Sequence, residues 1–237
     1  MSLDNLFNKK IIFFGDSITD ANRLLNSKYP NGFGFVSMIN DDYAINHSYA
    51  NITILNKGIS GNKTSDLLNR IDDILNESPD VVIILIGIND IWHPYGEGKK
   101  ADLYEVISNL KKIVNTFKEK KIRTILMTPF LFPVDEYLKD MIFIFNELYY
   151  EMTKYITSER IEYIDLYKPL KEYALIKGNH TVTLDGIHPT ILGYGIIAQQ
   201  VINYLWISEW YKWIFVLKHQ KLLINNKLKN TFYRYKL

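Results

Sequence analysis

The hydrophobic stretch Val81-Val82-Ile83-Ile84-Leu85-Ile86 runs directly into Gly87-Ile88-Asn89-Asp90. Its hydrophobicity is continuous rather than alternating, which is typical of a strand buried on both faces of a parallel sheet. Short apolar runs of the same kind recur along the chain, at residues 11–14, 52–55, 124–127 and 161–164. The sequence therefore predicts a mostly parallel sheet of five strands.

Longer amphipathic segments separate these runs. In residues 64–75, apolar side chains such as Leu67 and Ile74 fall on one helical face, and polar ones, including Arg70, are assigned to the rest. Thr64 is expected to be the N-cap of this helix. Similar patterns predict helices over residues 103–118, 137–156 and 190–205. Strands that alternate with helices predict an α/β fold, a three-layer α/β/α sandwich.

Four short motifs follow apolar runs or Gly-rich turns. In such sheets, sites form where loops leave the carboxyl ends of the strands. Together the motifs supply a hydroxyl, an imidazole with a nearby carboxylate, and hydrogen-bond donors, which are the groups that acyl transfer requires. They are Gly15-Asp16-Ser17, Gly58-Ile59-Ser60-Gly61, Gly87-Ile88-Asn89-Asp90 and Asp185-Gly186-Ile187-His188.

Ser17, His188 and Asp185 are the candidate catalytic residues. Ser17 follows the first strand and would be the nucleophile, with His188 as its base. Asp185 lies three residues before His188, close enough after a turn to orient the imidazole and to stabilise its protonated form. Each residue alone has a simpler interpretation, because serine often caps a helix and Asp-Gly often forms a surface turn. The four motifs in combination favour the catalytic interpretation.

Gly61 and Asn89 are the candidate oxyanion-hole residues. A glycine lets its backbone N–H approach a substrate oxygen closely, and the asparagine amide is a neutral donor. Asp16, beside Ser17, is expected to support the loop by hydrogen bonding rather than to act directly. Trp92 and Tyr95 follow Asn89 and are candidate pocket residues, although ordinary loop packing explains them equally well.

The four motifs resemble, in order and separation, the four blocks of the SGNH hydrolases, the GDSL-type esterases and lipases. The resemblance covers about residues 10–205. It implies a flavodoxin-like SGNH hydrolase fold and an acyl-serine intermediate without cofactor or metal, with the Ser17 N–H completing the oxyanion hole. The implied substrate is a small-molecule ester, such as an O-acetylated carbohydrate. Alternatives are a lysophospholipase-like lipid acyl hydrolase, an acyltransferase and, least favoured, a non-catalytic α/β binding module.

Other candidate chemistries find less support in the sequence. Ser60 lacks the spacing of a Gly-x-Ser-x-Gly elbow, and His180 has no aspartate at a similar spacing. The five histidines are scattered and there is no cysteine, so a metal site is not expected. The glycine-rich nucleotide-binding motifs Gly-x-Gly-x-x-Gly and Gly-x-x-x-x-Gly-Lys-Ser/Thr are both absent, which disfavours a nucleotide or flavin cofactor.

The chain of 237 residues carries a formal net charge of +2, but its charge is unevenly distributed: residues 212–237 contain Lys and Arg and no Asp or Glu. We expect a hydrolase domain over residues 1–205 and a basic, aromatic, helical appendage over residues 206–237. Packing of this appendage on the domain or on a second subunit, as in a homo-oligomer, is favoured over peripheral membrane contact, and nucleic-acid binding is not expected. No leader is recognised at the start, which predicts a cytoplasmic location.

Overall fold

The computed structural model describes residues 6–25 and 28–207, and it contains a single five-stranded sheet within that part of the chain. All neighbouring strands pair in parallel, in the order β2-β1-β3-β4-β5. The strands are β1 (Lys10–Gly15), β2 (Thr53–Gly58), β3 (Val81–Leu85), β4 (Arg123–Met127) and β5 (Glu162–Ile164). The predicted five-stranded parallel sheet is thus confirmed.

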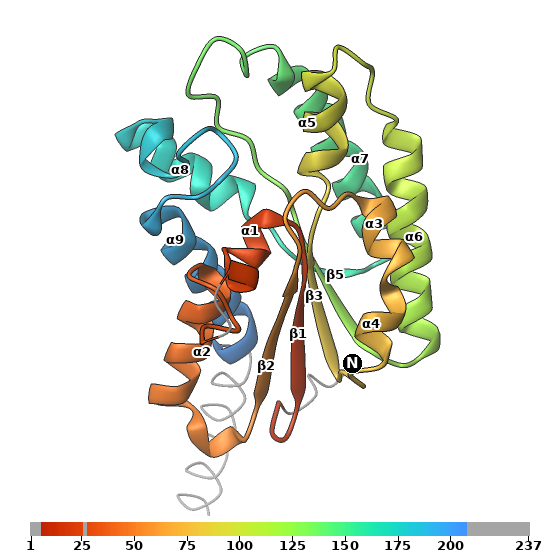
Figure 1. Ribbon diagram of the computed structural model, residues 1–237, viewed down its shortest axis with the longest axis vertical. Helices are drawn as coiled ribbons and strands as arrows, with labels where there is room; N and C mark the ends of the chain where they lie inside the picture. Colours follow the sequence, from red (N-terminus) through yellow and green to blue (C-terminus); the bar gives the residue numbers. More distant parts are fainter. Residues whose placement is uncertain (1–5, 26–27, 208–237) are drawn as a thin grey trace, which may run out of the picture. The chain divides into compact units, whose positions relative to one another are not determined.

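Helices cover both faces of the sheet, which confirms the three-layer α/β/α arrangement (Figure 1). One face carries α2 (Phe35–Asn46) and α9 (Ile191–Ile202), and the other carries α3 (Thr64–Asn69), α4 (Ile71–Leu75), α6 (Leu103–Glu119) and α7 (Met141–Ser158). The remaining helical elements are α1 (Ser17–Asp20), α5 (Ile88–Gly96), α8 (Tyr167–Lys177), η1 (Arg23–Leu25), η2 (Ser48–Ala50), η3 (Asn179–Thr181) and η4 (Asn203–Ile207).

The central strands β1 and β3 form the core of the sheet. Four consecutive side chains of β1, Ile11 through Phe14, are fully buried, and all five residues of β3 are buried as well. A strand covered on both faces has no solvent side, which explains the absence of alternation in these sequences. Burying each such side chain contributes about 1.5–3 kcal/mol. The edge strand β2, by contrast, alternates between buried and more exposed positions.

The register of the sheet brings the three strand ends level. Gly15 at the end of β1 pairs with Gly58 at the end of β2 and with Leu85 at the end of β3. The chain leaves β1 toward β2 on one side and later enters β3 on the other side, so the order of the strands reverses at β1. Such a reversal is where open α/β sheets bind ligands. The loops that follow all three strands therefore open onto one edge.

The prediction of one helix over residues 64–75, capped by Thr64, is wrong in two respects. The structure has two helices, α3 and α4, interrupted at Arg70, whose φ of −116° and ψ of 25° lie outside the helical region. At this interruption the Arg70 side chain contacts the ends of β1 and β2. The cap position is Lys63, not Thr64, and the Lys63 N–H donates to Asp66 Oδ2 at 2.8 Å.

Other helix boundaries also differ from expectation. The segment 137–156 becomes helical only at Met141, and α9 ends at Ile202, where the π-helical turn η4 follows. Three further helices were not predicted from the sequence: α2, α5 and α8. Helix α5 contains Pro94 in its interior, a residue that usually argues against a helix. Pro94 has no N–H to donate to the carbonyl of Asp90, four residues earlier, so the helix lacks one hydrogen bond there.

The described chain comprises a large compact unit, Leu6–Gln200, and a smaller grouping that includes residues 201–207. The predicted appendage over residues 206–237 lies outside the described residues except for its first two positions, so the predicted boundary stays a prediction. Within the described residues, no helix combines the length and the apolar character needed to cross a membrane.

Candidate active site

Ser17 is the first residue of α1, immediately beyond the end of β1. Asp16 occupies the N-cap position, and its Oδ1 accepts the Ile18 N–H at 2.9 Å. The alternative in which Ser17 itself caps the helix is therefore wrong, and its hydroxyl is available for another partner. The expected loop-supporting hydrogen bond of Asp16 is this cap.

The partner of the Ser17 hydroxyl is His188, although 171 residues separate the two in the chain. The Ser17 Oγ lies 2.9 Å from His188 Nε2, and His188 Nδ1 lies 2.6 Å from Asp185 Oδ2. A proton on Nδ1 would be donated to the carboxylate and would leave Nε2 to accept the serine hydroxyl proton. The three predicted catalytic side chains are thus joined in one hydrogen-bonded chain.

A tight turn holds Asp185 and His188 together. Thr183 and Pro189 form an antiparallel bridge, and the Leu184 N–H donates to the His188 carbonyl at 2.7 Å. Inside the turn, Asp185 Oδ1 accepts the His188 backbone N–H at 2.7 Å. Both oxygens of the carboxylate are therefore used within the same turn, and its orientation toward the imidazole is fixed.

The pKa values of this pair move in opposite directions. Partial burial would raise the pKa of Asp185, but hydrogen bonds from the His188 ring and from the turn backbone overcome it and hold the pKa at about 2. The hydrogen bond to Asp185 raises the pKa of His188 above its usual value of 6.5, against the opposing effect of burial. Each shift reflects stabilisation of the carboxylate–imidazolium pair.

The second and third motifs are linked to each other through Asn62, which follows Gly61. Gly61 has a φ of +80°, in the left-handed region where glycine carries no steric penalty. The Asn89 side chain is 1% exposed, and its Nδ2 donates to the Asn62 carbonyl at 3.0 Å. An asparagine amide has two N–H groups, so a second donor remains on the same nitrogen. The contact with Asn62 links this amide to the loop that carries Gly61.

Arg70 is a residue of this region that the sequence interpretation placed on the polar face of a helix. Its Nη2 donates to the Gly15 and Lys57 carbonyls at 3.1 Å and 2.9 Å, and its Nε donates to Asn62 Oδ1 at 2.7 Å. A signal was present, since Arg70 lies three residues after Leu67 and four before Ile74. These spacings place it on the apolar face.

Asp90 is a second residue whose place the sequence did not reveal. Its carboxylate accepts the Thr64 N–H at 3.0 Å and the Thr64 hydroxyl at 2.6 Å, which ties the start of α3 to the start of α5. Burial raises the pKa of Asp90 to about 6, against the lowering effect of these hydrogen bonds. Asp90 follows Asn89 directly, so the contact also fixes the position of that amide.

Asp16 is fully buried beside Ser17. Burial raises the pKa of Asp16 to about 7, against the hydrogen bond from Ile18 and the nearby His188. Among the described residues, no hydrogen-bond partner is found for its second oxygen, Oδ2. A buried carboxylate oxygen without a donor favours the protonated form. Asp16 therefore holds a titratable proton close to the serine.

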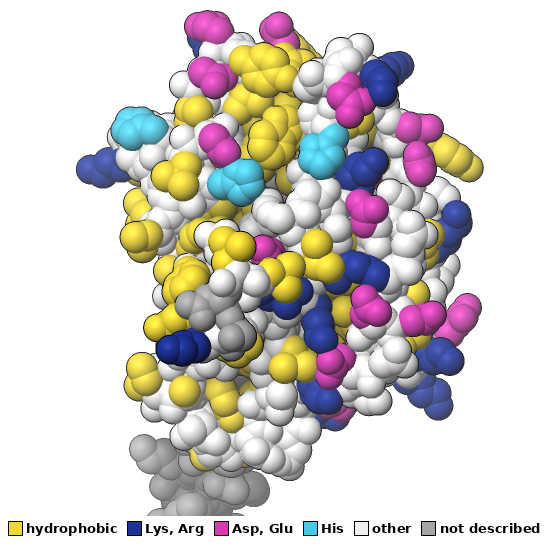
Figure 2. Space-filling model, in the orientation of Figure 1, with side chains coloured by type: hydrophobic (Ala, Val, Ile, Leu, Met, Phe, Trp, Pro, Cys, Tyr) yellow, Lys and Arg dark blue, Asp and Glu magenta, His cyan; other side chains and the backbone are white. Residues whose placement is uncertain are grey.

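Two rings of α5 lie beside His188 and Gly61. The Trp92 ring packs edge-on against the His188 ring, with 5.7 Å between centroids, and His93 Cε1 lies 3.9 Å from where a Cβ on Gly61 would be. The Tyr95 hydroxyl instead donates to the Tyr137 carbonyl at 2.6 Å. Figure 2 shows hydrophobic and histidine side chains together toward the top of this face, above the carboxyl ends of the strands.

In the described part of the chain, Ser60 and His180, the alternative nucleophile and base, make no hydrogen bond with Ser17, His188 or Asp185. Ser60 and His180 are both exposed, and the His180 ring lies against Gly178 rather than against the serine. Within residues 6–25 and 28–207, no group of three His, Asp or Glu side chains is arranged to hold a metal ion.

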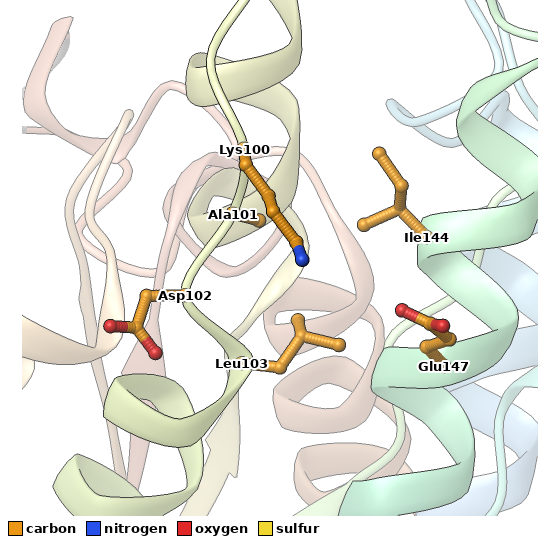
Figure 3. A pocket seen from close by; sticks show the side chains of 6 residues that line it. All are labelled: Lys100, Ala101, Asp102, Leu103, Ile144 and Glu147. Atoms are coloured by element: carbon orange, nitrogen blue, oxygen red, sulfur yellow. The ribbon is translucent and has the colours of Figure 1, made fainter.

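A separate pocket opens between the start of α6 and helix α7 (Figure 3). It has a volume of about 530 Å³, and the Lys100 amino group points toward the side of α7. None of its lining residues belongs to the four motifs, so the pocket is distinct from the serine site. They are Lys100, Ala101, Asp102, Leu103, Ile144 and Glu147.

The fold and the motifs place the chain in a known class of enzymes. The model of the GDSL-like Lipase/Acylhydrolase family matches residues 11–201. The chain belongs to this family, and it is an ester-bond hydrolase. This confirms both the resemblance to the GDSL-type esterases and the expected enzyme class.

Individual relatives narrow the comparison. An acetylxylan esterase from Geobacillus stearothermophilus is 30% identical over 214 residues, covering 85% of this chain and 97% of that protein. The crystal structure of Axe2, an acetylxylan esterase from this organism, matches with a TM-score of 0.77 and 27% identity, over 86% of this chain and 97% of that one. A protein from Parabacteroides merdae named as a GDSL-like lipase matches with a TM-score of 0.79 and 26% identity, over 86% of this chain and 99% of that one.

Proposed function

We propose that the protein hydrolyses short-acyl esters of carbohydrates through an acyl-serine on Ser17. The observation that carries this proposal is the continuous contact from Ser17 Oγ to His188 Nε2 and from His188 Nδ1 to Asp185. Solved variants of Axe2 called catalytic mutants replace a serine, a histidine, or an aspartate three residues before that histidine. The same residue types at the same spacing support the assignment here.

In the first half-reaction, Ser17 Oγ attacks the ester carbonyl carbon while its proton passes to His188 Nε2. The tetrahedral intermediate collapses when the bond to the alcohol oxygen breaks, and His188 returns the proton to that oxygen. Asp185 stays ionised, in accord with its pKa of about 2, and stabilises the transient imidazolium. In the second half-reaction, water attacks the acyl-serine with His188 again as base, and the acid and free Ser17 are released.

The oxyanion formed in each half-reaction needs donors. We assign the backbone N–H groups of Ser17 and Gly61 and the Nδ2 of Asn89 to this role. Asn89 supports the assignment because it is buried and already oriented by its contact with the Asn62 carbonyl. Removal of one such donor typically costs about 2.7–4 kcal/mol of transition-state stabilisation.

The carbohydrate substrate class rests on similarity to the acetylxylan esterase. A short acyl group agrees with the rings around the site, because Trp92 packs on His188 and His93 lies over Gly61. We expect these two rings to limit the length of the acyl chain that the site accepts. An acetyl ester is therefore the substrate that we favour over lipid acyl esters.

Hydrolysis of p-nitrophenyl esters from acetyl to long acyl, followed by acetylated xylooligosaccharides, tests the proposal. We expect a preference for acetyl and loss of turnover in Ser17→Ala. Full activity of Ser17→Ala would disprove the serine assignment. A preference for long chains would instead support a lipid substrate, and ester products formed with added acceptor alcohols would identify an acyltransferase.

A further inference from the structure

We propose that Arg70 is a positioning residue for the oxyanion hole: its guanidinium holds the ends of β1 and β2 against Asn62 and so fixes the loop that carries Gly61. This inference rests on the proposed function, in which Ser17, Gly61 and Asn89 bind the oxyanion. Arg70 itself touches no reacting atom.

The contacts of Arg70 converge on the beginnings of two catalytic loops. The Gly15 carbonyl, two residues before Ser17, accepts both Arg70 Nη2 at 3.1 Å and the Ile59 N–H at 3.0 Å. The Lys57 carbonyl at the end of β2 accepts Nη2 at 2.9 Å. A single planar guanidinium therefore fixes the spacing between the two strand ends from which the serine loop and the Gly61 loop depart.

The contact with Asn62 extends this anchor to both remaining oxyanion donors. Asn62 Oδ1 accepts Arg70 Nε at 2.7 Å, and the Asn62 backbone carbonyl accepts the Asn89 amide at 3.0 Å. Because Asn62 follows Gly61 directly, the orientation of its peptide unit affects the donor on one side and the amide of Asn89 on the other. Arg70 thus acts on all three donors through neighbouring backbone.

The surroundings of Arg70 keep it charged and in place. Its guanidinium carbon lies 4.5 Å above the centre of the Phe14 ring, a cation–π contact on a fully buried side chain. Burial, with Arg23 nearby, lowers the pKa of Arg70 to about 10, so the guanidinium remains protonated at neutral pH. A buried charge with several carbonyl acceptors holds one geometry better than a neutral side chain would.

The test compares Arg70→Ala with Arg123→Ala. Arg123 is a matched control because it is likewise partly buried, with 15% of its side chain exposed, and pairs with Glu162. It begins β4 at the amino end of the sheet, away from the strand ends that carry the site. Both variants lose a partly buried guanidinium, so loss of fold stability alone affects both.

We expect Arg70→Ala to lower kcat for p-nitrophenyl acetate by about 10²-fold, as for loss of an oxyanion donor, with little change in KM. Affinity for a boronic acid, which forms a tetrahedral adduct on the serine, should fall in parallel. Arg123→Ala should lose thermal stability but keep kcat. Arg70→Lys should recover only part of kcat, and guanidinium added at low millimolar concentration should partly restore Arg70→Ala. Retention of kcat by a folded Arg70→Ala would overturn the inference.

Asn62→Ala keeps the test decisive if Arg70→Ala does not fold. This variant removes only the side-chain acceptor of Arg70 Nε and leaves the backbone carbonyls in place. We expect it to lower kcat, and its effect should not add to that of Arg70→Lys, because both act through one contact. Additive effects would overturn the inference. Ser17→Ala measured in parallel separates failure of the proposed function from failure of this inference. If Ser17→Ala is active, the proposed function is rejected. If Ser17→Ala is inactive and Arg70→Ala is fully active, only the role of Arg70 is rejected.

Discussion

Asp185 binds His188 twice: Oδ2 lies 2.6 Å from the ring Nδ1, and Oδ1 accepts the backbone N–H at 2.7 Å. One oxygen fixes the position of the turn and the other orients the ring. In the part of the chain that the structure describes, the hydrogen bonds found for this carboxylate all come from the turn itself. This relationship makes the pH dependence of the enzyme a direct readout of the pair.

Asp185→Asn should change the pH profile as well as the rate. His188 must be neutral to accept the serine proton, so kcat/KM of the wild type should rise with pH, with a midpoint above the usual histidine pKa of 6.5. The variant loses the charge that raises the pKa of His188, so this limb should move to lower pH. The plateau should fall by about 10²–10⁴-fold. An unchanged midpoint, measured with p-nitrophenyl acetate across the pH range, would contradict the assignment.

Trp92→Ala should broaden the acyl preference. The indole packs against His188, and its removal opens space beside the reacting carbonyl. We expect the ratio of kcat/KM for butyryl over acetyl esters to rise by about tenfold or more, because each methylene accommodated in an apolar pocket is worth about tenfold or more. Tyr104→Ala is the control, because Tyr104 is 85% exposed on α6. An equal ratio in both variants would show that Trp92 does not limit the acyl pocket.

Asp16→Asn should alter how stability depends on pH. The pKa of Asp16 is about 7 in the fold against an ordinary value of 3.8, so the folded state holds the proton more tightly. This contribution is fully present below about pH 4 and is lost as pH rises through about 7. The Tm of the variant relative to wild type should therefore increase between about pH 5 and pH 8. Thermal melts that show a constant difference would place the carboxyl in a different protonation state.

Gly58→Ala should disrupt the junction between β2 and α1. A Cβ at Gly58 would lie 2.2 Å from the Asp20 nitrogen and 2.7 Å from its Cα, and backbone cannot move aside cheaply. We expect a loss of about 2–3 kcal/mol in the free energy of unfolding and a displaced Ser17.

Gly195→Ala is the counterpart of that substitution. Gly195 lies inside α9 with nothing within 4 Å of its added Cβ, so alanine should stabilise the helix by about 1 kcal/mol. Urea unfolding of both variants gives the comparison. Equal changes in the free energy of unfolding in the two variants would mean that the close approach of Gly58 to the Asp20 backbone does not determine the effect of the substitution.

Local patterns were sufficient for the sheet and for the order of the motifs. The central strands are continuous apolar runs, and three of the four motifs lie at the carboxyl ends of β1, β2 and β3, so topology alone placed Ser17 and Asn89 on one edge. The fourth motif follows α8 and η3 rather than a strand, so its place beside Ser17 was not given by that rule. The contacts of Arg70 were not predicted because its acceptors are carbonyl groups of β1 and β2, which are remote in sequence. The Asp90–Thr64 contact was missed for the same reason, since tertiary hydrogen bonds have no local period.

The turn between Thr183 and Pro189 has a mechanical consequence. Because the base and its carboxylate lie in one closed turn, a displacement of the turn moves both together and leaves their mutual geometry intact. Such a displacement would instead lengthen the contact between Ser17 Oγ and His188 Nε2. The base would then stay paired with its carboxylate even where its contact with the nucleophile is lost.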